Sequence, residues 1–185
     1  MQTLAGKPTL KLRCIAENHK IFSMTTPLLE ERKRLLTDRL GAIRKLADRL
    51  TWSNKRVGFP LDAATLRTMD DARAESLSAF IERSSRLQDL LGATFREVAS
   101  LSGQPAEDYN LVLSTMEKAG ITNADAWREL RALRNEVAHE YSLDAARQVG
   151  LFNSLGEASG EILSTAQRLA RYCTERLGIE HGAKG

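Results

Sequence analysis

The sequence has few cysteines, few prolines, few aromatic residues and no long apolar run. Its two cysteines, Cys14 and Cys173, are too few for a disulfide framework in 185 residues. Four prolines and an aromatic fraction of 5% fit an all-β sandwich poorly. No stretch reaches the roughly 18 consecutive apolar residues of a membrane-spanning helix, so we expect no transmembrane segment and no membrane partner.

The residue spacings of a metal site are missing as well. None of the three histidines forms a zinc-type pattern with the cysteines, so we expect neither a metal nor a cofactor. His19 and His181 fall in the expected terminal segments, which leaves His139 as the one histidine inside a structured segment. Charge interrupts the apolar residues of the N-terminus, unlike a secretory signal, and a cytoplasmic location follows by default.

Charge is the first positive feature of the sequence. The formal net charge is +3, which permits contact with nucleic acid without requiring it. The positive excess is concentrated between Glu30 and Arg56, and it includes the run Arg32, Lys33 and Arg34. A solvated helix face explains this most simply, and a surface for RNA or an acidic partner is the alternative.

Apolar residues recur every three or four positions over most of the chain, which predicts an all-α fold. We expect residues 1–23 to be a poorly ordered lead-in, with Met24 a possible true start, and residues 179–185 to be a flexible tail. Between them, residues 24–178 should form a single-domain, up-and-down bundle of four to five helices. The expected helices begin at Thr26-Pro27 and then span about Asp70–Leu101, Pro105–Ala119, Ala124–Tyr141 and, after a Ser142 cap, Leu143–Leu177.

Two of these helices carry long apolar seams that need a partner helix along their whole length. The first seam consists of Leu77, Phe80, Ser84, Leu87, Leu91, Thr94, Val98 and Leu101. The second consists of Val149, Phe152, Leu155, Ser159, Ile162, Ala166, Leu169 and Cys173.

The short helix before Tyr141 places polar groups beside its core face. On a helical wheel advancing about 100° per residue, Leu130 and Val137 share one arc that is closed by Trp127. Arg134 falls inside the edge of this arc, where an apolar residue would be expected. Burying a guanidinium without a partner is costly, so Arg134 should meet a carboxylate, a phosphate or a second subunit.

Asn135 and His139 lie four residues apart, so their side chains adjoin on the flank of the same helix. Arg128 and Arg131 share that flank. This group is either a functional site or an ordinary solvated face, since a histidine near a helix C-terminus is already favourable through the helix dipole.

The string Arg134-Asn135-Glu136-Val137-Ala138-His139-Glu140-Tyr141 resembles the Arg-Asn-x-x-x-His-x-Tyr signature of HEPN-domain proteins. It resembles more narrowly the HEPN toxins encoded beside minimal nucleotidyltransferase antitoxins in prokaryotes. The segment Phe80–Leu91 is similar to the corresponding helix of some members. The resemblance covers about residues 26 to 178 and implies a HEPN-like helical bundle.

The resemblance implies a metal-independent endoribonuclease that acts as a homodimer, with two motifs forming one cleft. Arg134 and His139 would be the catalytic pair, Asn135 a polar neighbour, and Tyr141 the acceptor of AMP from the antitoxin. RNA supplies its own nucleophile, the 2′-hydroxyl, while imidazole can move the proton and guanidinium can hold the phosphoryl oxygens. On this account Arg134 finds its partner outside its own chain.

Two other functions remain open from the sequence. A non-catalytic HEPN module could bind a nucleotide or present a substrate to a nucleotidyltransferase with the same residues. A helical adaptor could instead work through its first helix. The candidates for an RNA or partner surface are Arg128, Arg131, Arg32, Lys33 and Arg34.

Overall fold

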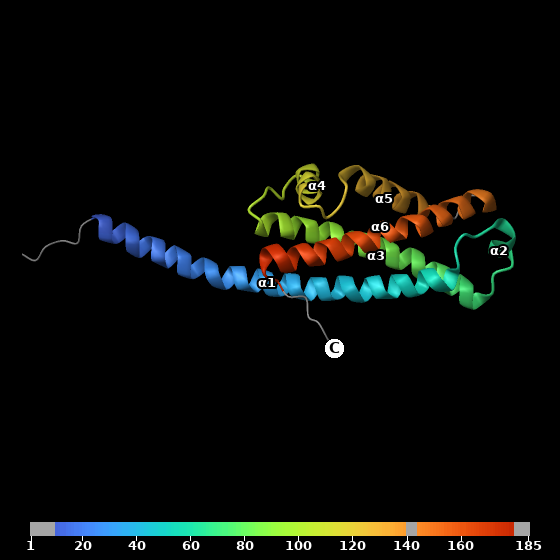
Figure 1. Ribbon diagram of the computed structural model, residues 1–185, viewed down its shortest axis with the longest axis horizontal. Coiled ribbons are helices and arrows are strands. Elements are labelled where there is room, and N and C mark those ends of the chain that lie inside the picture. The colour runs from blue at the N-terminus through green and yellow to red at the C-terminus, as the bar shows by residue number, and fades with distance from the viewer. Residues whose placement is uncertain (1–9, 140–143, 180–185) are drawn as a thin grey trace, which may run out of the picture. The chain divides into compact units, whose positions relative to one another are not determined.

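The computed structural model describes the backbone of residues 10–139 and 144–179, and the side chains of residues 27–139 and 144–179. Every regular element in this part of the chain is an α-helix, so the all-α prediction is confirmed (Figure 1). The helices are α1 (Leu10–Val57), α2 (Ala63–Arg67), α3 (Asp71–Leu101), α4 (Tyr109–Lys118), α5 (Ala124–Val137) and α6 (Ala145–Leu177). None of these helices, within the described residues, is long and apolar enough to cross a membrane.

The chain divides into two compact units, residues 1–36 and residues 37–185, where the sequence predicted one domain. The boundary falls inside α1, which begins at Leu10 rather than at Thr26-Pro27 and contains Pro27 in its interior. Proline has a backbone φ that suits a helix, but in a helix interior it lacks an N–H donor and its ring crowds the carbonyl four residues earlier, so it is most favourable in the first turn. It therefore signals a helix start in a sequence without fixing one.

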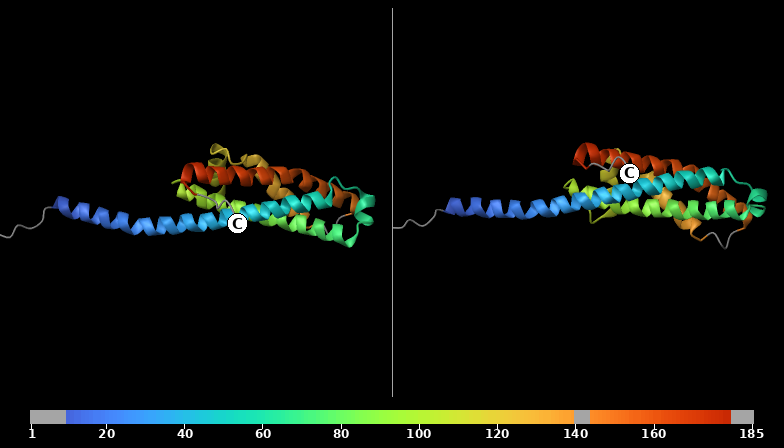
Figure 2. Two further views of the ribbon diagram at one scale, coloured as in Figure 1. Left: turned by 60° about the horizontal axis from the view of Figure 1, so that its bottom comes forward. Right: turned by 90° about the horizontal axis from the view of Figure 1, so that it is seen from below.

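In the second unit, the four longer helical segments alternate in direction. Residues 37–57 of α1 and all of α5 run one way, while α3 and α6 run the other (Figure 1). The turned views show residues 37–57 beside α3 and α6 (Figure 2). Asn54 donates a hydrogen bond to Ser159 of α6 at 2.7 Å, and Arg83 of α3 donates to the carbonyl of Arg49 at 3.3 Å. The arrangement is that of an up-and-down bundle.

The core of this unit is made of the seams that the sequence predicted. In α3 and α6, the seam residues that were expected inside are buried, apart from the half-buried Leu101 and Val149 at the seam ends. Residues 37–57 add Leu40, Ile43 and Leu50. Each fully buried leucine or phenylalanine stabilises the fold by about 1.5–3 kcal/mol relative to an exposed one, so these seams hold the helices together.

Helix ends are set by side-chain caps and by left-handed glycines. The carboxylate of Asp144 accepts the backbone N–H of Arg147 at 2.9 Å and caps α6, so this helix starts two residues later than expected. The expected cap, Ser142, lies outside the described residues. Glycine acts at the C-terminal end of α4. Gly120 follows this helix at a φ of 68°, a left-handed conformation that suits glycine and ends the helix.

Two further boundaries differ from the expected ones. The helix expected from Pro105 begins at Tyr109, because the Asp108 carboxylate accepts the N–H of Asn110 at 2.8 Å and forms the cap. Between the first expected helix and the one expected from Asp70, α1 continues to Val57 and α2 forms a single short turn after it.

Candidate functional site

The side chain of Trp127 fixes α5 against α3 and α4. Its indole is 1% exposed, and the ring centroids of Trp127 and Phe95 lie 4.9 Å apart. Its Nε1 donates a hydrogen bond to the hydroxyl of Tyr109 at 2.8 Å. Arg131 and Arg134 follow Trp127 by four and seven residues, so helical spacing puts them on the same side of α5, facing α3.

A hydrogen bond from α6 and an N-terminal cap fix the start of α5. Arg168 of α6 donates from Nε to the carbonyl oxygen of Ile121 at 2.8 Å, just before α5 begins. The side chain of Asn123 accepts the N–H of Ala126 at 2.9 Å. These contacts set the direction of the helix that carries the Arg-Asn-x3-His-x-Tyr string.

Arg134 has a partner inside its own chain. Its Nη2 lies 2.7 Å from Oδ2 of Asp89 on α3, with the Arg134 side chain 31% exposed and that of Asp89 61% exposed. The expectation that Arg134 needs a partner from outside the chain is therefore wrong. A wheel drawn for one helix cannot show which carboxylate the facing helix presents, although a carboxylate was among the three partners that the wheel allowed.

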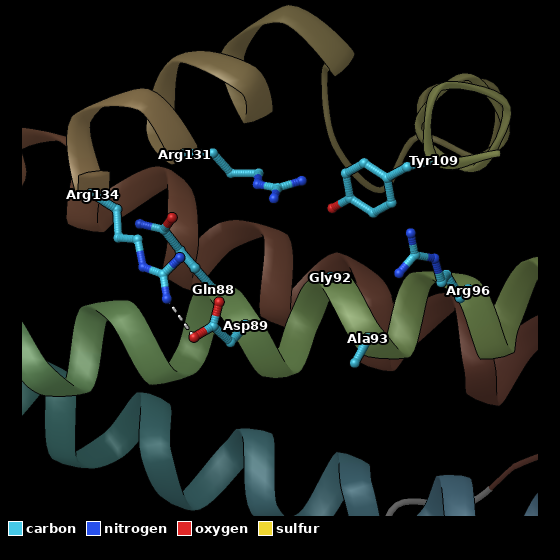
Figure 3. A pocket seen from close by; sticks show the side chains of 8 residues that line it. All are labelled: Gln88, Asp89, Gly92, Ala93, Arg96, Tyr109, Arg131 and Arg134. Carbon is cyan, nitrogen blue, oxygen red and sulfur yellow. Dashed lines mark hydrogen bonds and ion pairs between the residues drawn. The ribbon is translucent and has the colours of Figure 1, made fainter. Parts of the chain in front are cut away.

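Arg134 lines a cleft of about 230 Å³ between α3, α4 and α5 (Figure 3). The residues around it are Gln88, Asp89, Gly92, Ala93, Arg96, Tyr109, Arg131 and Arg134. Three guanidinium groups and one carboxylate leave the cleft with a formal charge of +2. Such a group of arginines, close together and partly enclosed, favours an anionic ligand.

Tyr109 stands between two of these arginines. The guanidinium carbons of Arg96 and Arg131 each lie 4.9 Å from the centroid of its ring, which is within the range of a cation–π contact. They approach the ring from α3 and α5 respectively (Figure 3). A Cβ atom at position 92 would lie 3.0 Å from the Tyr109 hydroxyl, so Gly92 leaves room for this ring.

Gln88 is a buried polar residue of the cleft. It is 3% exposed, and neither its Oε1 nor its Nε2 has a hydrogen-bond partner among the described residues. Figure 3 shows its carboxamide directed from α3 toward α5, on the side of Arg131 and Arg134. A buried amide without partners costs roughly 1–3 kcal/mol, and a polar group in that position needs an explanation.

The other residues of the string lie outside the cleft. Asn135 is exposed on α5, and His139 is exposed just beyond the C-terminal cap, where its backbone N–H donates to the Glu136 carbonyl at 3.1 Å. Neither residue lines the cleft that contains Arg134. Tyr141 lies outside the described residues.

The remaining surface candidates are separated in the structure. Arg128 forms an ion pair with Asp125 at 2.6 Å and contacts the Asn110 side chain at 3.4 Å, so it belongs to the outer face of α5 and α4. Of the two α5 candidates, only Arg131 shares the cleft with Arg134.

Arg32, Lys33 and Arg34 belong to the first unit. Lys33 lies 3.5 Å from Glu30, and the Arg34 guanidinium makes two hydrogen bonds to Glu31, at 2.8 and 3.0 Å. The bonds from Arg34 lower the pKa of the Glu31 carboxyl. Acidic side chains one turn earlier thus offset much of the positive charge that the sequence suggested here.

Sequence reasoning missed four residues of the cleft: Gln88, Asp89, Arg96 and Tyr109. One signal was present for Gln88, which lies four residues after Ser84 and three before Leu91 and so falls on the buried side of α3. A glutamine at such a position needs a hydrogen-bond partner. No comparable signal marked Arg96 or Tyr109, because each is an ordinary residue on a partly exposed face.

Other reactive groups give no second site. No cluster of three or more histidine, cysteine, aspartate or glutamate side chains within the described residues could hold a metal ion. Cys173 is buried on α6, and burial raises the pKa of its thiol to about 12, so it remains protonated near neutral pH. A buried, protonated thiol is a poor nucleophile.

Comparison with known proteins adds no relative. The sequence matches no protein-family model, no curated protein and no solved structure.

Proposed function

We propose that this protein is a toxin-type, metal-independent endoribonuclease, with Arg134 and His139 as its catalytic pair and a nucleotidyltransferase as its antitoxin. One observation carries the proposal: the string Arg-Asn-x3-His-x-Tyr, which begins near the end of α5, just before the last long helix of an all-α bundle. The resemblance of this string to HEPN toxins supplies the activity, and the chemistry of the two side chains is consistent with it.

The reaction needs only groups that RNA and these side chains supply. A neutral His139 imidazole would accept the proton of a ribose 2′-hydroxyl, whose oxygen then attacks the adjacent phosphorus. The bond from phosphorus to the 5′-oxygen breaks, and that oxygen takes a proton from the His139 imidazolium, which leaves a 2′,3′-cyclic phosphate, a 5′-hydroxyl and a neutral imidazole. Histidine suits this role because its ordinary pKa lies close to neutral pH, and the exposed His139 is accessible to a strand.

Arg134 would stabilise the negative charge that gathers on the phosphoryl oxygens. A guanidinium has five N–H donors, and the ion pair with Asp89 engages Nη2. The remaining donors stay available for two phosphoryl oxygens, and paired hydrogen bonds of this kind are strong and directional. Asp89 would then hold the guanidinium in one orientation, which lowers the cost of ordering it when RNA binds.

The homodimer and the modified Tyr141 are parts of the same proposal. In a composite site, His139 and Arg134 of two copies would face one strand across a twofold axis. The pairing with Asp89 removes the need for a second subunit to balance the charge of Arg134, so the dimer rests on the family resemblance alone.

A second function has one observation in its favour. Arg134 faces a cleft together with Arg131 and Gln88, and His139 does not line that cleft. A non-catalytic module that binds a nucleotide, or presents a substrate to a nucleotidyltransferase, would use the cleft and have no need of the imidazole.

Expression in a host without the antitoxin separates the two functions. Wild-type protein, His139→Ala and the control Arg86→Ala are induced in parallel, with growth and RNA integrity as readouts. Arg86 is an exposed arginine of α3 that lies outside the cleft between α3, α4 and α5. The ribonuclease account predicts growth arrest and RNA fragments for wild type and Arg86→Ala, and neither for His139→Ala. Normal growth and intact RNA with all three proteins would favour the binding module.

A further inference from the structure

We infer that the cleft between α3, α4 and α5 binds a terminal phosphate group, held by Arg96, Arg131 and Arg134 with Gln88 at its floor. The inference does not rest on the proposed ribonuclease activity, because it makes no use of His139. It concerns a binding site in which Arg134 is the single residue of the Arg-Asn-x3-His-x-Tyr string.

The net charge of the cleft suits a dianionic group. The three guanidinium groups and Asp89 give the cleft a formal charge of +2. A phosphate monoester carries about −1.5 to −2 at neutral pH, because its second pKa is near 6. Among the described residues, Arg96 and Arg131 have no carboxylate partner within 4 Å, so their charge is not neutralised by the protein. A dianionic group fits this balance better than the single charge of an internal phosphodiester.

The buried amide of Gln88 also favours a polar ligand, independently of the charge of the cleft. Its two polar atoms are without partners although it is 3% exposed. The amide offers one donor group and one acceptor. The oxygens of inorganic phosphate or of a monoester accept from Nε2, and the dianion of inorganic phosphate also keeps one P–OH that donates to Oε1. Inorganic phosphate therefore satisfies both atoms at once, and a dianionic monoester satisfies Nε2.

Two arginines of the cleft are preorganised by Tyr109. Tyr109 holds the guanidinium groups of Arg96 and Arg131 at equal distances of 4.9 Å from its ring centroid. Its hydroxyl is in turn fixed by the buried indole of Trp127 at 2.8 Å. Side chains that are already ordered lose less entropy on binding, and the planar guanidinium matches two phosphoryl oxygens.

The floor of the cleft also selects a terminal phosphate over an internal one. Gln88 lines the cleft and is 3% exposed, so a group that contacts its amide has to enter the cleft deeply, with its end first. A terminal phosphate presents three oxygens at its end, whereas an internal phosphodiester continues as a strand on both sides. Two sources share this chemistry: a small phosphate ester and the 5′-phosphate of an RNA chain.

Calorimetric titration of the full chain with inorganic phosphate tests the site. All titrations use the His139→Ala background, so that RNA is not consumed. We expect one saturable site, weakened about tenfold or more by Arg96→Gln and by Arg131→Gln, since each removes a hydrogen bond to a charged group. The control Arg86→Gln changes an exposed arginine of α3 that lies outside the cleft. This variant should bind phosphate as tightly as the His139→Ala background does.

Gln88→Leu tests the floor of the cleft separately from its charge. The leucine has a similar size and needs no hydrogen-bond partner, so we expect the melting temperature to be unchanged or raised while phosphate binding weakens. Absence of saturable phosphate binding in the background protein, or equal weakening by Arg86→Gln and Arg96→Gln, would overturn the inference. Binding that survives in Gln88→Leu, Arg96→Gln and Arg131→Gln would overturn it as well.

A short RNA with and without a 5′-phosphate distinguishes the two sources. Binding of the 5′-phosphorylated RNA about tenfold tighter than of the 5′-hydroxyl form, and tighter than inorganic phosphate, identifies an RNA end. Binding of inorganic phosphate with no preference between the two RNAs identifies a small phosphate ester. Tighter binding of the 5′-hydroxyl RNA would contradict a terminal-phosphate site.

Discussion

Arg134 of α5 and Asp89 of α3 form a 2.7 Å ion pair that ties the first residue of the Arg-Asn-x3-His-x-Tyr string to the neighbouring helix. The pair is partly exposed, with 31% of the arginine side chain and 61% of the aspartate side chain accessible. It therefore orients the guanidinium without burying it, and Arg134 stays at the rim of a cleft that holds two other arginines.

The energy of this pair should be small. A double-mutant cycle with Asp89→Ala and Arg134→Ala is expected to give a coupling energy of about 0.2–1 kcal/mol, as for other solvent-exposed pairs. Urea denaturation of the four proteins measures it. A coupling of about 3 kcal/mol or more would show a desolvated pair and would contradict the exposure seen here.

The hydrogen bond from Trp127 to Tyr109 should contribute more to the free energy of unfolding than a hydrogen bond between exposed side chains does. Tyr109→Phe leaves the Nε1–H of the buried Trp127 without its acceptor, which should lower the free energy of unfolding by about 1–3 kcal/mol. Tyr172→Phe is the matched control, because the Tyr172 hydroxyl makes only a 3.4 Å contact with Ser102. Equal losses for the two variants in urea denaturation would show that Trp127 does not depend on Tyr109.

Two glycines of α6 should respond in opposite ways to alanine. Gly160 is exposed with nothing within 4 Å of an added Cβ, so Gly160→Ala should stabilise by up to about 1 kcal/mol through helix propensity. At Gly156 the added Cβ would lie 2.8 Å from Cγ of Phe59, whose ring packs on Phe80 at 5.0 Å. Gly156→Ala should therefore destabilise by about 1–3 kcal/mol despite the same gain in propensity.

Thermal melts of the two glycine variants check this pair. A rise in melting temperature for Gly160→Ala and a fall for Gly156→Ala are expected. A rise for both would mean that Phe59 moves aside without loss of packing.

The buried thiol of Cys173 should make stability fall at high pH. Burial raises its pKa from 9.0 to about 12, so between these values the folded protein keeps a proton that the unfolded chain releases. This contribution is complete below about pH 9 and is lost as the pH rises toward 12. Urea denaturation between about pH 8 and 11 should show a downward slope that is shallower in Cys173→Ala. An identical slope in both proteins would assign the loss to other groups.

The sequence predicted the fold well where a repeating pattern existed. Spacings of three and four residues located the seams of α3 and α6, and burial follows them closely. Helix starts were less well predicted. Several residue types can cap a helix, so Asp144 could not be distinguished from Ser142, and the position of Pro27 gave a false start for α1.

The site was predicted only in the part that lies on one helix. The string of α5 was visible in the sequence, but the cleft around Arg134 depends on Gln88, Asp89 and Arg96 of α3. Which turn of α3 faces which turn of α5 is decided by tertiary packing, in particular by Trp127 against Phe95. The spacing of apolar residues within either helix does not determine how the two helices are aligned.

The central claim is that Arg134 and His139 cleave RNA, and purified protein in EDTA tests it most directly. Wild-type protein should convert a short RNA into fragments that end in a 2′,3′-cyclic phosphate. His139→Ala should lower the rate by about 100-fold or more through the loss of general acid–base catalysis, and Arg134→Ala should do so through the loss of charge stabilisation. The variants must melt as the wild type does. Intact RNA after incubation with wild-type protein, or cleavage by His139→Ala at the wild-type rate, would contradict the account.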